Sequence, residues 1–168
     1  MKLEPIIELP YMVTGLWRQF AVHLFEGKVT LADMDRIEAE SAVCHAKVKG
    51  KLVELVVILP STAQMTHDER VRMGRVIKRW ETKRVASSTV ILAEGLIASV
   101  HRSVLTGLQM LVPPPHPTKV FGTTFEAVRW LRPHIDEVCG EQTSADALLA
   151  SIDTLRARFG ARVERAPG

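Results

Sequence analysis

The sequence predicts an α/β protein with a mixed, mostly parallel sheet of about five strands, helices packed on it, and a C-terminal helix. Two observations predict this class. Strand-like and helix-like segments alternate along the chain, and residues 52–59 and 89–93 are apolar on both faces, as buried parallel strands are. In addition, a threonine followed three residues later by an acid, the spacing of a capping box, precedes three of the helical patterns.

Length and composition indicate one globular domain with short extensions. The chain has 168 residues, of which 46% are hydrophobic and 24% charged. We expect an N-terminal extension over residues 1–10, a domain over residues 11–134 and a C-terminal helical extension over residues 135–168. No apolar run spans a bilayer and no signal-peptide pattern is seen, so a cytoplasmic location is expected.

The first third of the chain reads as a hairpin followed by a helix. Apolar and other residues alternate over residues 20–25, and together with the β-rich run 11–17 they predict two antiparallel strands. Thr30 and Asp33 then have capping-box spacing, so a helix is expected from here to Gly50.

The middle of the chain repeats a strand followed by a helix. Pro60 ends the buried strand 52–59, and Thr66 with Glu69 begins a helix that we expect to reach about residue 84. The next strand is predicted over residues 89–93, and a further helix over residues 96–112.

The last third contains a short strand and two helices. Prolines make residues 113–117 an extended connection to a strand at residues 119–121. A helix is expected to begin at Thr123 and to end at Pro133. Residues 144–159 then predict an amphipathic helix whose apolar stripe either packs back on the domain or contacts a second copy, which would give a homo-oligomer.

Several segments resemble the STAS, or SpoIIAA-like, superfamily of anti-sigma-factor antagonists. The strands 55–59 and 90–93, the segment 99–108 and the strand 119–121 carry this resemblance. So does the following stretch with its pattern Glu126-Ala127-x-x-Trp130-Leu131, which is similar to the end of many stand-alone bacterial members. The resemblance covers about residues 11–134.

The resemblance implies a non-catalytic module that binds a partner protein and is sometimes switched by phosphorylation. In the antagonists, the phosphorylated Ser or Thr begins the helix after a central strand in an Asp-Ser-x-Gly-like context. The matching loop here, residues 60–67, carries Ser61, Thr62 and Thr66 without that pattern. Other branches of the superfamily resemble lipid-carrying domains.

The loop at residues 60–67 is one candidate site, because ligands of α/β sheets bind at the carboxyl ends of parallel strands. A phosphate on Ser61, Thr62 or Thr66 would lie near a helix N-terminus, where free amide groups favour negative charge. The alternative is that Thr66 only caps the helix and that Ser61 and Thr62 only turn the chain.

A basic stripe is the second candidate. Residues 67–84 contain seven Lys or Arg against three Asp or Glu, although the net charge of the whole chain is only +3. The residues spaced three or four apart within it are Arg72, Arg75, Arg79 and Lys83. They predict a surface for an acidic partner, and the alternative is a solvated helix face.

Other chemistry finds no support in the sequence. The six histidines and two cysteines have no metal-ligand spacing, and no nucleophile elbow, phosphate-binding loop or dinucleotide fingerprint is present. A nucleic-acid partner is not expected either, since aromatic residues do not alternate with the basic ones. We therefore expect a regulatory module without cofactor or metal that acts by protein–protein contact. The alternative is a carrier of a lipid or small hydrophobic ligand, which needs an apolar cavity.

Overall fold

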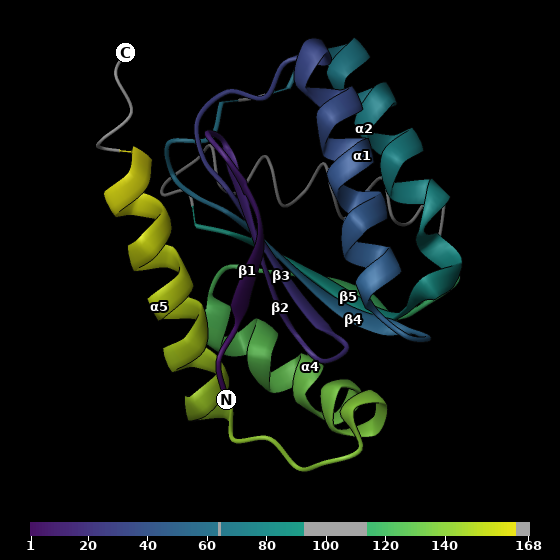
Figure 1. Ribbon diagram of the computed structural model, residues 1–168, viewed down its shortest axis with the longest axis vertical. Helices are drawn as coiled ribbons and strands as arrows, with labels where there is room; N and C mark the ends of the chain where they lie inside the picture. The colour runs from purple at the N-terminus through teal and green to yellow at the C-terminus, as the bar shows by residue number, and fades with distance from the viewer. Residues whose placement is uncertain (64, 93–113, 164–168) are drawn as a thin grey trace.

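A single sheet of six strands, arranged in the order of the chain, forms the centre of the molecule (Figure 1). The structure is a computed structural model that describes residues 1–63, 65–92 and 114–163. Each of the first two strands is antiparallel to the strand that follows it, and the last three strands run parallel to the third. The strands are β1 (Glu4–Leu9), β2 (Met12–Trp17), β3 (Phe20–Phe25), β4 (Leu52–Ile58), β5 (Arg84–Ile91) and β6 (Thr118–Phe121).

The sheet confirms the predicted hairpin and adds a strand in front of it. Strands β2 and β3 pair antiparallel from Met12 opposite Phe25 to Trp17 opposite Phe20. Residues 1–10 were expected to be an extension, but β1 pairs with β2 and buries Ile7 and Leu9. Pro5 is compatible with this strand because it lies on the sheet edge, next to a break in the β1–β2 register.

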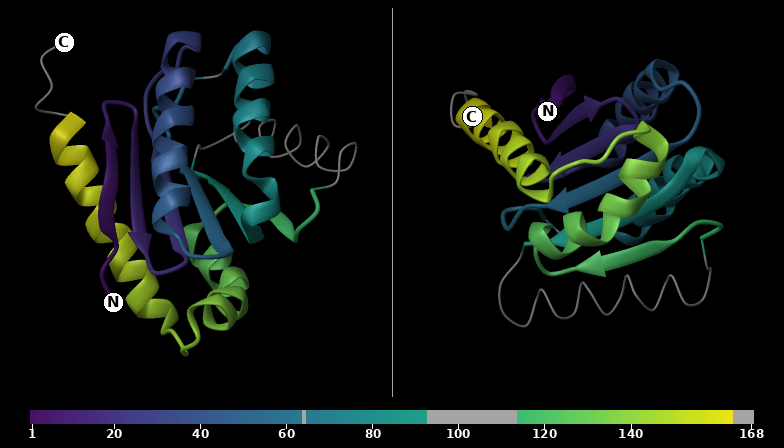
Figure 2. Two further views of the ribbon diagram at one scale, coloured as in Figure 1. Left: turned by 45° about the vertical axis from the view of Figure 1, so that its right-hand side comes forward. Right: turned by 90° about the horizontal axis from the view of Figure 1, so that it is seen from below.

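Among the described residues, helices cover both faces of the sheet (Figure 2). One layer consists of α1 (Leu31–Lys47) and α2 (His67–Arg79), and the other of α4 (Thr124–Cys139) and α5 (Ala145–Val163). Because side chains alternate along a strand, β3 contributes Ala21 to the core under α1 and α2, and Phe20, Val22 and Leu24 to the core under α4 and α5. Strand β4, which is apolar except for Glu54, is thus buried between two layers, as its sequence predicts.

Helix α4 continues past the proline that was expected to end it. Pro133 lies inside the helix, which ends only at Cys139, before Gly140 with its left-handed φ of 70°. A proline inside a helix removes one hydrogen bond, but the turns after it bury Ile135 completely and Cys139 nearly so. Packing therefore keeps the helix together, and the domain boundary expected at residue 134 falls within it.

Helix α5 packs back on the domain, which is the first of the two alternatives left open by its sequence. Its apolar stripe of Leu148, Ile152, Leu155 and Phe159 belongs to the core under α4. Gly15 of β2 makes room for it, since a Cβ atom there would lie 2.7 Å from Leu155 Cδ2. The stripe is consequently buried within one chain and does not supply the surface for a homo-oligomer.

The helix expected to reach residue 84 is shorter than predicted. Helix α2 ends at Arg79, a short 3-10 turn η1 (Glu81–Lys83) follows, and β5 begins at Arg84. Strand β5 starts early because Arg84, Ala86 and Ser88 are all buried in the sheet. The predicted helix at residues 96–112 lies outside the described residues. Among those that are described, no helix is long and apolar enough to cross a membrane.

Candidate functional site

The start of α2 has the capping box that its sequence predicts. The Thr66 hydroxyl accepts a hydrogen bond of 3.3 Å from the Glu69 backbone N–H, and the Glu69 carboxylate accepts one of 2.7 Å from the Thr66 N–H. Asp68 and Glu69 place negative charge in the first turn, where the helix dipole favours it. The fold thus uses the Thr66 hydroxyl to begin α2.

The other two hydroxyls of the predicted loop lie at the carboxyl end of β4. Thr62 donates through Oγ1 to the carbonyl of Phe25 at 2.8 Å and so ties the loop to the end of β3. Ser61 is exposed, and its Oγ donates to Glu26 Oε1, also at 2.8 Å. Ser61 and Thr66 are both exposed, and of the three predicted hydroxyls only that of Ser61 makes no hydrogen bond to the backbone of the described residues.

A pocket of about 380 Å³ lies beside this loop, between the ends of β3 and β4 and helix α5. Sites for apolar ligands are lined mainly by hydrophobic side chains. Here three of the seven lining residues are charged, namely Glu26, Asp153 and Arg156. A second pocket, of about 120 Å³, is too small for a lipid. Neither pocket has the character that a lipid carrier requires.

The structure divides the predicted basic stripe. Arg72 bonds to both Asp35 and Glu38 of α1, at 2.7 and 2.6 Å, and Arg79 also bonds to Glu38. These two guanidinium groups lower the pKa of Glu38 from its ordinary value. They join α1 to α2, which lie side by side over the sheet (Figure 2).

The remaining two residues of the stripe have different surroundings. Lys83 belongs to η1, where its Nζ donates to the His45 carbonyl at 3.4 Å and lies 5.7 Å from the centre of the Trp80 ring. Arg75 is exposed, and within the described part of the chain its side chain makes no hydrogen bond or ion pair. Of the four stripe residues, Arg75 is thus the one without a hydrogen bond, ion pair or ring contact among the described residues.

Arg75 lies on a surface that sequence reasoning had not recognised. Helix positions 71, 74, 75 and 78 share one side of a helix, and position 77 borders it. All five are exposed, including the large hydrophobic residues Val71 at 43% and Ile77 at 49%. We call this surface the α2 outer face; it consists of Val71, Gly74, Arg75, Ile77 and Lys78. The sequence feature that could have revealed this surface is the presence of apolar residues at positions 71 and 77 among basic ones.

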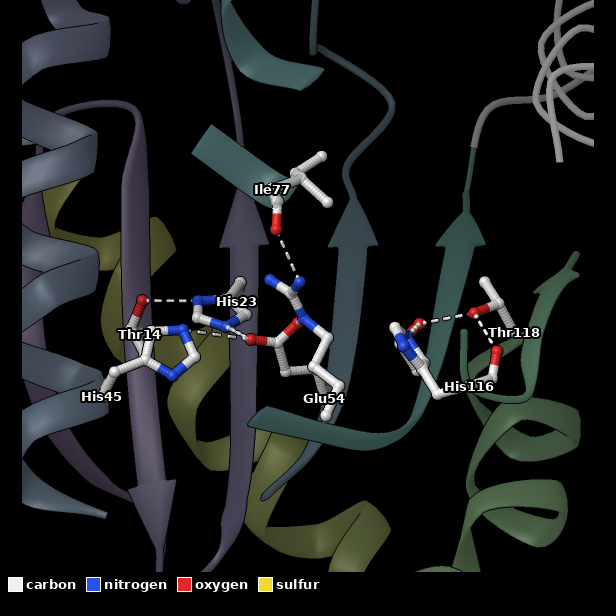
Figure 3. Close-up of polar contacts among 9 residues, drawn as sticks. Thr14, His23, His45, Glu54, Ile77, His116 and Thr118 are labelled. Atoms are coloured by element: carbon white, nitrogen blue, oxygen red, sulfur yellow. Dashed lines mark hydrogen bonds and ion pairs between the residues drawn. The ribbon is translucent and has the colours of Figure 1, made fainter. Parts of the chain in front are cut away.

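Beneath α1 and α2 lies a row of polar side chains that the sequence analysis missed (Figure 3). Glu54 of β4 and Arg84 of β5 form a buried ion pair. His23 and His45 each place Nε2 at 3.8 Å from Glu54 Oε1, and the Thr14 hydroxyl lies 2.8 Å from His23 Nδ1. A single acid inside an otherwise apolar strand was the signal that could have revealed this row.

The charges in this row are balanced. Burial alone raises the pKa of Glu54, but His23 and the Arg84 guanidinium outweigh it and lower the pKa to about 2. Burial lowers the pKa of His45 to about 4, although Glu54 opposes this change. At neutral pH the row therefore contains an ionised Glu54, a cationic Arg84 and a neutral His45.

This row also holds the far end of α2. Arg84 donates from Nη1 to the Ile77 carbonyl at 2.8 Å, and that carbonyl, in the last turn of α2, also accepts from the Trp80 backbone N–H at 3.2 Å. The Trp80 ring stacks on His45 of α1, with ring centres 4.5 Å apart. The two helices are thus fixed to each other and to the sheet by contacts that are partly buried.

A second polar contact joins β5 to the loop before β6 (Figure 3). Ser87 Oγ lies 3.0 Å from His116 Nε2 and 3.1 Å from Thr118 Oγ1. A serine hydrolase needs an acid on the other ring nitrogen of the histidine. Within the described residues, His116 Nδ1 has no hydrogen-bond partner, so a Ser-His-acid triad is not formed there.

Comparison with known proteins defines the class of fold. No protein-family model and no curated protein matches the sequence. Among solved structures, the chain is similar to an uncharacterised protein of the DUF3478 family with a SpoIIAA-like fold from Shewanella loihica. The TM-score is 0.54 at 14% sequence identity, over 72% of this chain and 94% of that one. The protein therefore has a SpoIIAA-like α/β fold, which confirms the predicted fold class and the resemblance at the level of the fold.

Proposed function

We propose that this protein is a non-catalytic regulatory module that binds an acidic protein partner through the α2 outer face. The observation that carries this proposal is the composition of that face. Two exposed hydrophobic side chains, Val71 and Ile77, lie next to cationic side chains, Arg75 and Lys78, that are not neutralised within the described part of the chain.

The distribution of exposed apolar side chains supports the same layer. Isolated exposed hydrophobics are ordinary, whereas a group of them on one layer marks an interaction surface. Among the residues whose burial the structure describes, large exposed hydrophobics other than Met1 occur on α1, α2 and α4; they are Leu31, Val43, Val71, Ile77 and Phe125. Four of these five belong to the layer of α1 and α2.

Charge and apolar area have different roles in such a contact. Exposed Arg75 and Lys78 attract an acidic surface and orient the encounter, while burial of Val71 and Ile77 supplies affinity. Arg72 and Arg79, bonded to Glu38, keep α2 in place, and so does the buried Glu54–Arg84 pair. The surface is consequently rigid before the partner arrives, which lowers the entropy cost of binding.

Ser61 is the position where we propose a phosphorylation switch. Its hydroxyl is exposed, and its one bond goes to the Glu26 carboxylate. A phosphate would be repelled by that carboxylate, and the loop between β4 and α2 would have to rearrange.

Both cysteines, Cys44 and Cys139, are free and buried, which supports the reducing cytoplasm as the location.

The proposal is tested by cross-linking followed by an affinity measurement. A photo-crosslinking phenylalanine analogue replaces Val71 in cells that produce the protein, and the control carries it in place of Phe125, which is exposed on α4 at 51%. We expect a protein that cross-links from position 71 and not from position 125. If both positions capture the same proteins, or neither captures any, the α2 outer face is not a docking surface.

The cross-linked protein is then purified, and its affinity is measured by calorimetry. The double substitution Arg75→Glu and Lys78→Glu is expected to weaken binding by a factor of ten or more, because it places like charges against the acidic partner. The control, Arg129→Glu, changes a charge on the opposite layer and should leave the affinity unchanged. Equal affinity of the double variant and the unaltered protein would refute the proposal.

A further inference from the structure

Gly74 lies in the middle of α2, at a position where the described residues give no reason for a glycine. It is exposed, and an added Cβ atom would find nothing within 4 Å among the described residues. Its φ is not in the left-handed region, unlike that of Gly27, Gly50 and Gly140. Glycine in a helix interior is less stable than alanine, because it loses more backbone freedom on folding.

At Gly15, in contrast, packing inside the protein explains why the residue is a glycine. There a Cβ atom would meet Leu155 Cδ2 at 2.7 Å and Leu3 Cβ at 3.2 Å, so the close approach of α5 requires a glycine. Nothing of this kind approaches Gly74 from within the described chain. A glycine that weakens its own helix and contacts nothing within the described chain leaves room for a close contact with another molecule.

We infer that Gly74 is the point at which a helix of the acidic partner crosses α2 in close contact. This inference rests on the function proposed above and adds the form of the partner. The missing side chain lets two helix axes approach more closely than larger residues allow. Val71 and Ile77, three residues before and after Gly74, lie on either side of the crossing and provide its apolar contacts.

The charges favour a different protein over a second copy of this chain. In a symmetric contact of two α2 helices, Arg75 and Lys78 of one copy would face the same residues of the other, and like charges repel. A partner helix with acidic residues beside small or apolar ones matches both the charge and the shape of the α2 outer face.

Substitutions at Gly74 separate this inference from a purely structural role. The probe is the protein that cross-links from position 71. We expect Gly74→Ala to raise the Tm by about 2–4 °C, because alanine stabilises a helix, and yet to weaken partner binding by about a factor of ten. Gly74→Leu should weaken binding further while the chain remains folded.

The matched control is Gly160 of α5. It is also a helical glycine whose added Cβ atom would meet nothing within 4 Å. Gly160→Ala should raise the Tm without changing the affinity. If Gly74→Ala and Gly74→Leu bind as well as the unaltered protein while Arg75→Glu/Lys78→Glu binds weakly, the close crossing is wrong and the docking surface stands. If the charge variant also binds normally, both proposals fail.

Discussion

Arg84 and Glu54 form an ion pair whose two side chains are only 7% and 6% exposed. The pair connects β4 to β5 under the layer of α1 and α2. Removing two charges from water costs several kcal/mol per ion, so a buried pair persists only when further polar groups satisfy both partners. Here His23 and His45 approach the carboxylate, and the Ile77 carbonyl accepts a hydrogen bond from the guanidinium.

Removing one partner of this ion pair should therefore destabilise the protein more than removing both partners. We expect Glu54→Leu to lower the free energy of unfolding by about 3–5 kcal/mol, because it leaves the Arg84 charge buried without a counterion. The double substitution Glu54→Leu and Arg84→Met should recover most of this loss. Urea denaturation followed by circular dichroism measures both. A double variant that is as unstable as the single one would show that the pair itself is not what stabilises this region.

The same row predicts that the protein loses stability in acid. The pKa of His45 is about 4 in the fold against an ordinary 6.5, so the unfolded chain takes up this proton first as the pH falls below 6.5. The pKa of Glu54 is about 2 against an ordinary 4.5, so its contribution is present above pH 4.5 and is lost as the pH falls toward 2. Stability should thus decline from about pH 6.5 downward.

A variant at His45 isolates the upper part of that decline. Phenylalanine at this position keeps a ring against Trp80 but cannot take up a proton. For His45→Phe, the free energy of unfolding should therefore vary less between pH 6.5 and 4.5, while the decline below pH 4.5 remains. Urea titrations at several pH values decide the matter. An unchanged slope above pH 4.5 would assign the pH dependence to other groups.

Alanine substitutions at the bonded and at the unbonded arginines of the basic stripe should have different effects on stability. Arg72→Ala removes bonds to Asp35 and Glu38 and should lower the urea midpoint, with an effect that shrinks as salt is added. Arg75→Ala removes an exposed side chain that is not bonded to any described residue, so the midpoint should stay unchanged. Equal effects of the two substitutions would contradict the division of the stripe that the structure shows.

The contact between Gly15 and Leu155 predicts a stability defect that a second substitution repairs. Gly15→Ala places a methyl group 2.7 Å from Leu155 Cδ2 and should destabilise the protein by about 1–3 kcal/mol. In a chain that already carries Leu155→Ala, the same Gly15→Ala change should cost less, because the closest conflicting atom is gone and only Leu3 Cβ, at 3.2 Å, remains near. A double-mutant cycle in urea measures this coupling; strictly additive effects would exclude the contact.

Local signals were sufficient for much of the fold. The hairpin of β2 and β3 was predicted from alternation, and α1 and α2 begin at the capping residues Thr30 and Thr66. Such signals depend on neighbours within about four positions, which the sequence shows directly. They failed at Pro133, where burial of Ile135 and Cys139 outweighs the local preference to end the helix.

The candidate site was predictable only in part. The number and spacing of basic residues on α2 follow from the sequence, but their partners do not. Arg72 and Arg79 meet Glu38, which lies 34 and 41 positions earlier, and Glu54 meets Arg84 across two strands. Within the described chain, the Arg75 side chain makes no hydrogen bond or ion pair, and a Cβ atom added at Gly74 would meet nothing within 4 Å. A sequence alone cannot show that a contact is missing.

The sequence by itself determined the α/β class, the order of most elements and the apolar stripe of the C-terminal helix, because these depend on periodicity and on turn chemistry. The tertiary structure decided that β1 joins the sheet, that α5 packs against Gly15, and which cations of α2 remain exposed. The reason is that pairing between strands and between helices brings together residues far apart in the chain, and its free energy depends on geometry that only the folded protein has.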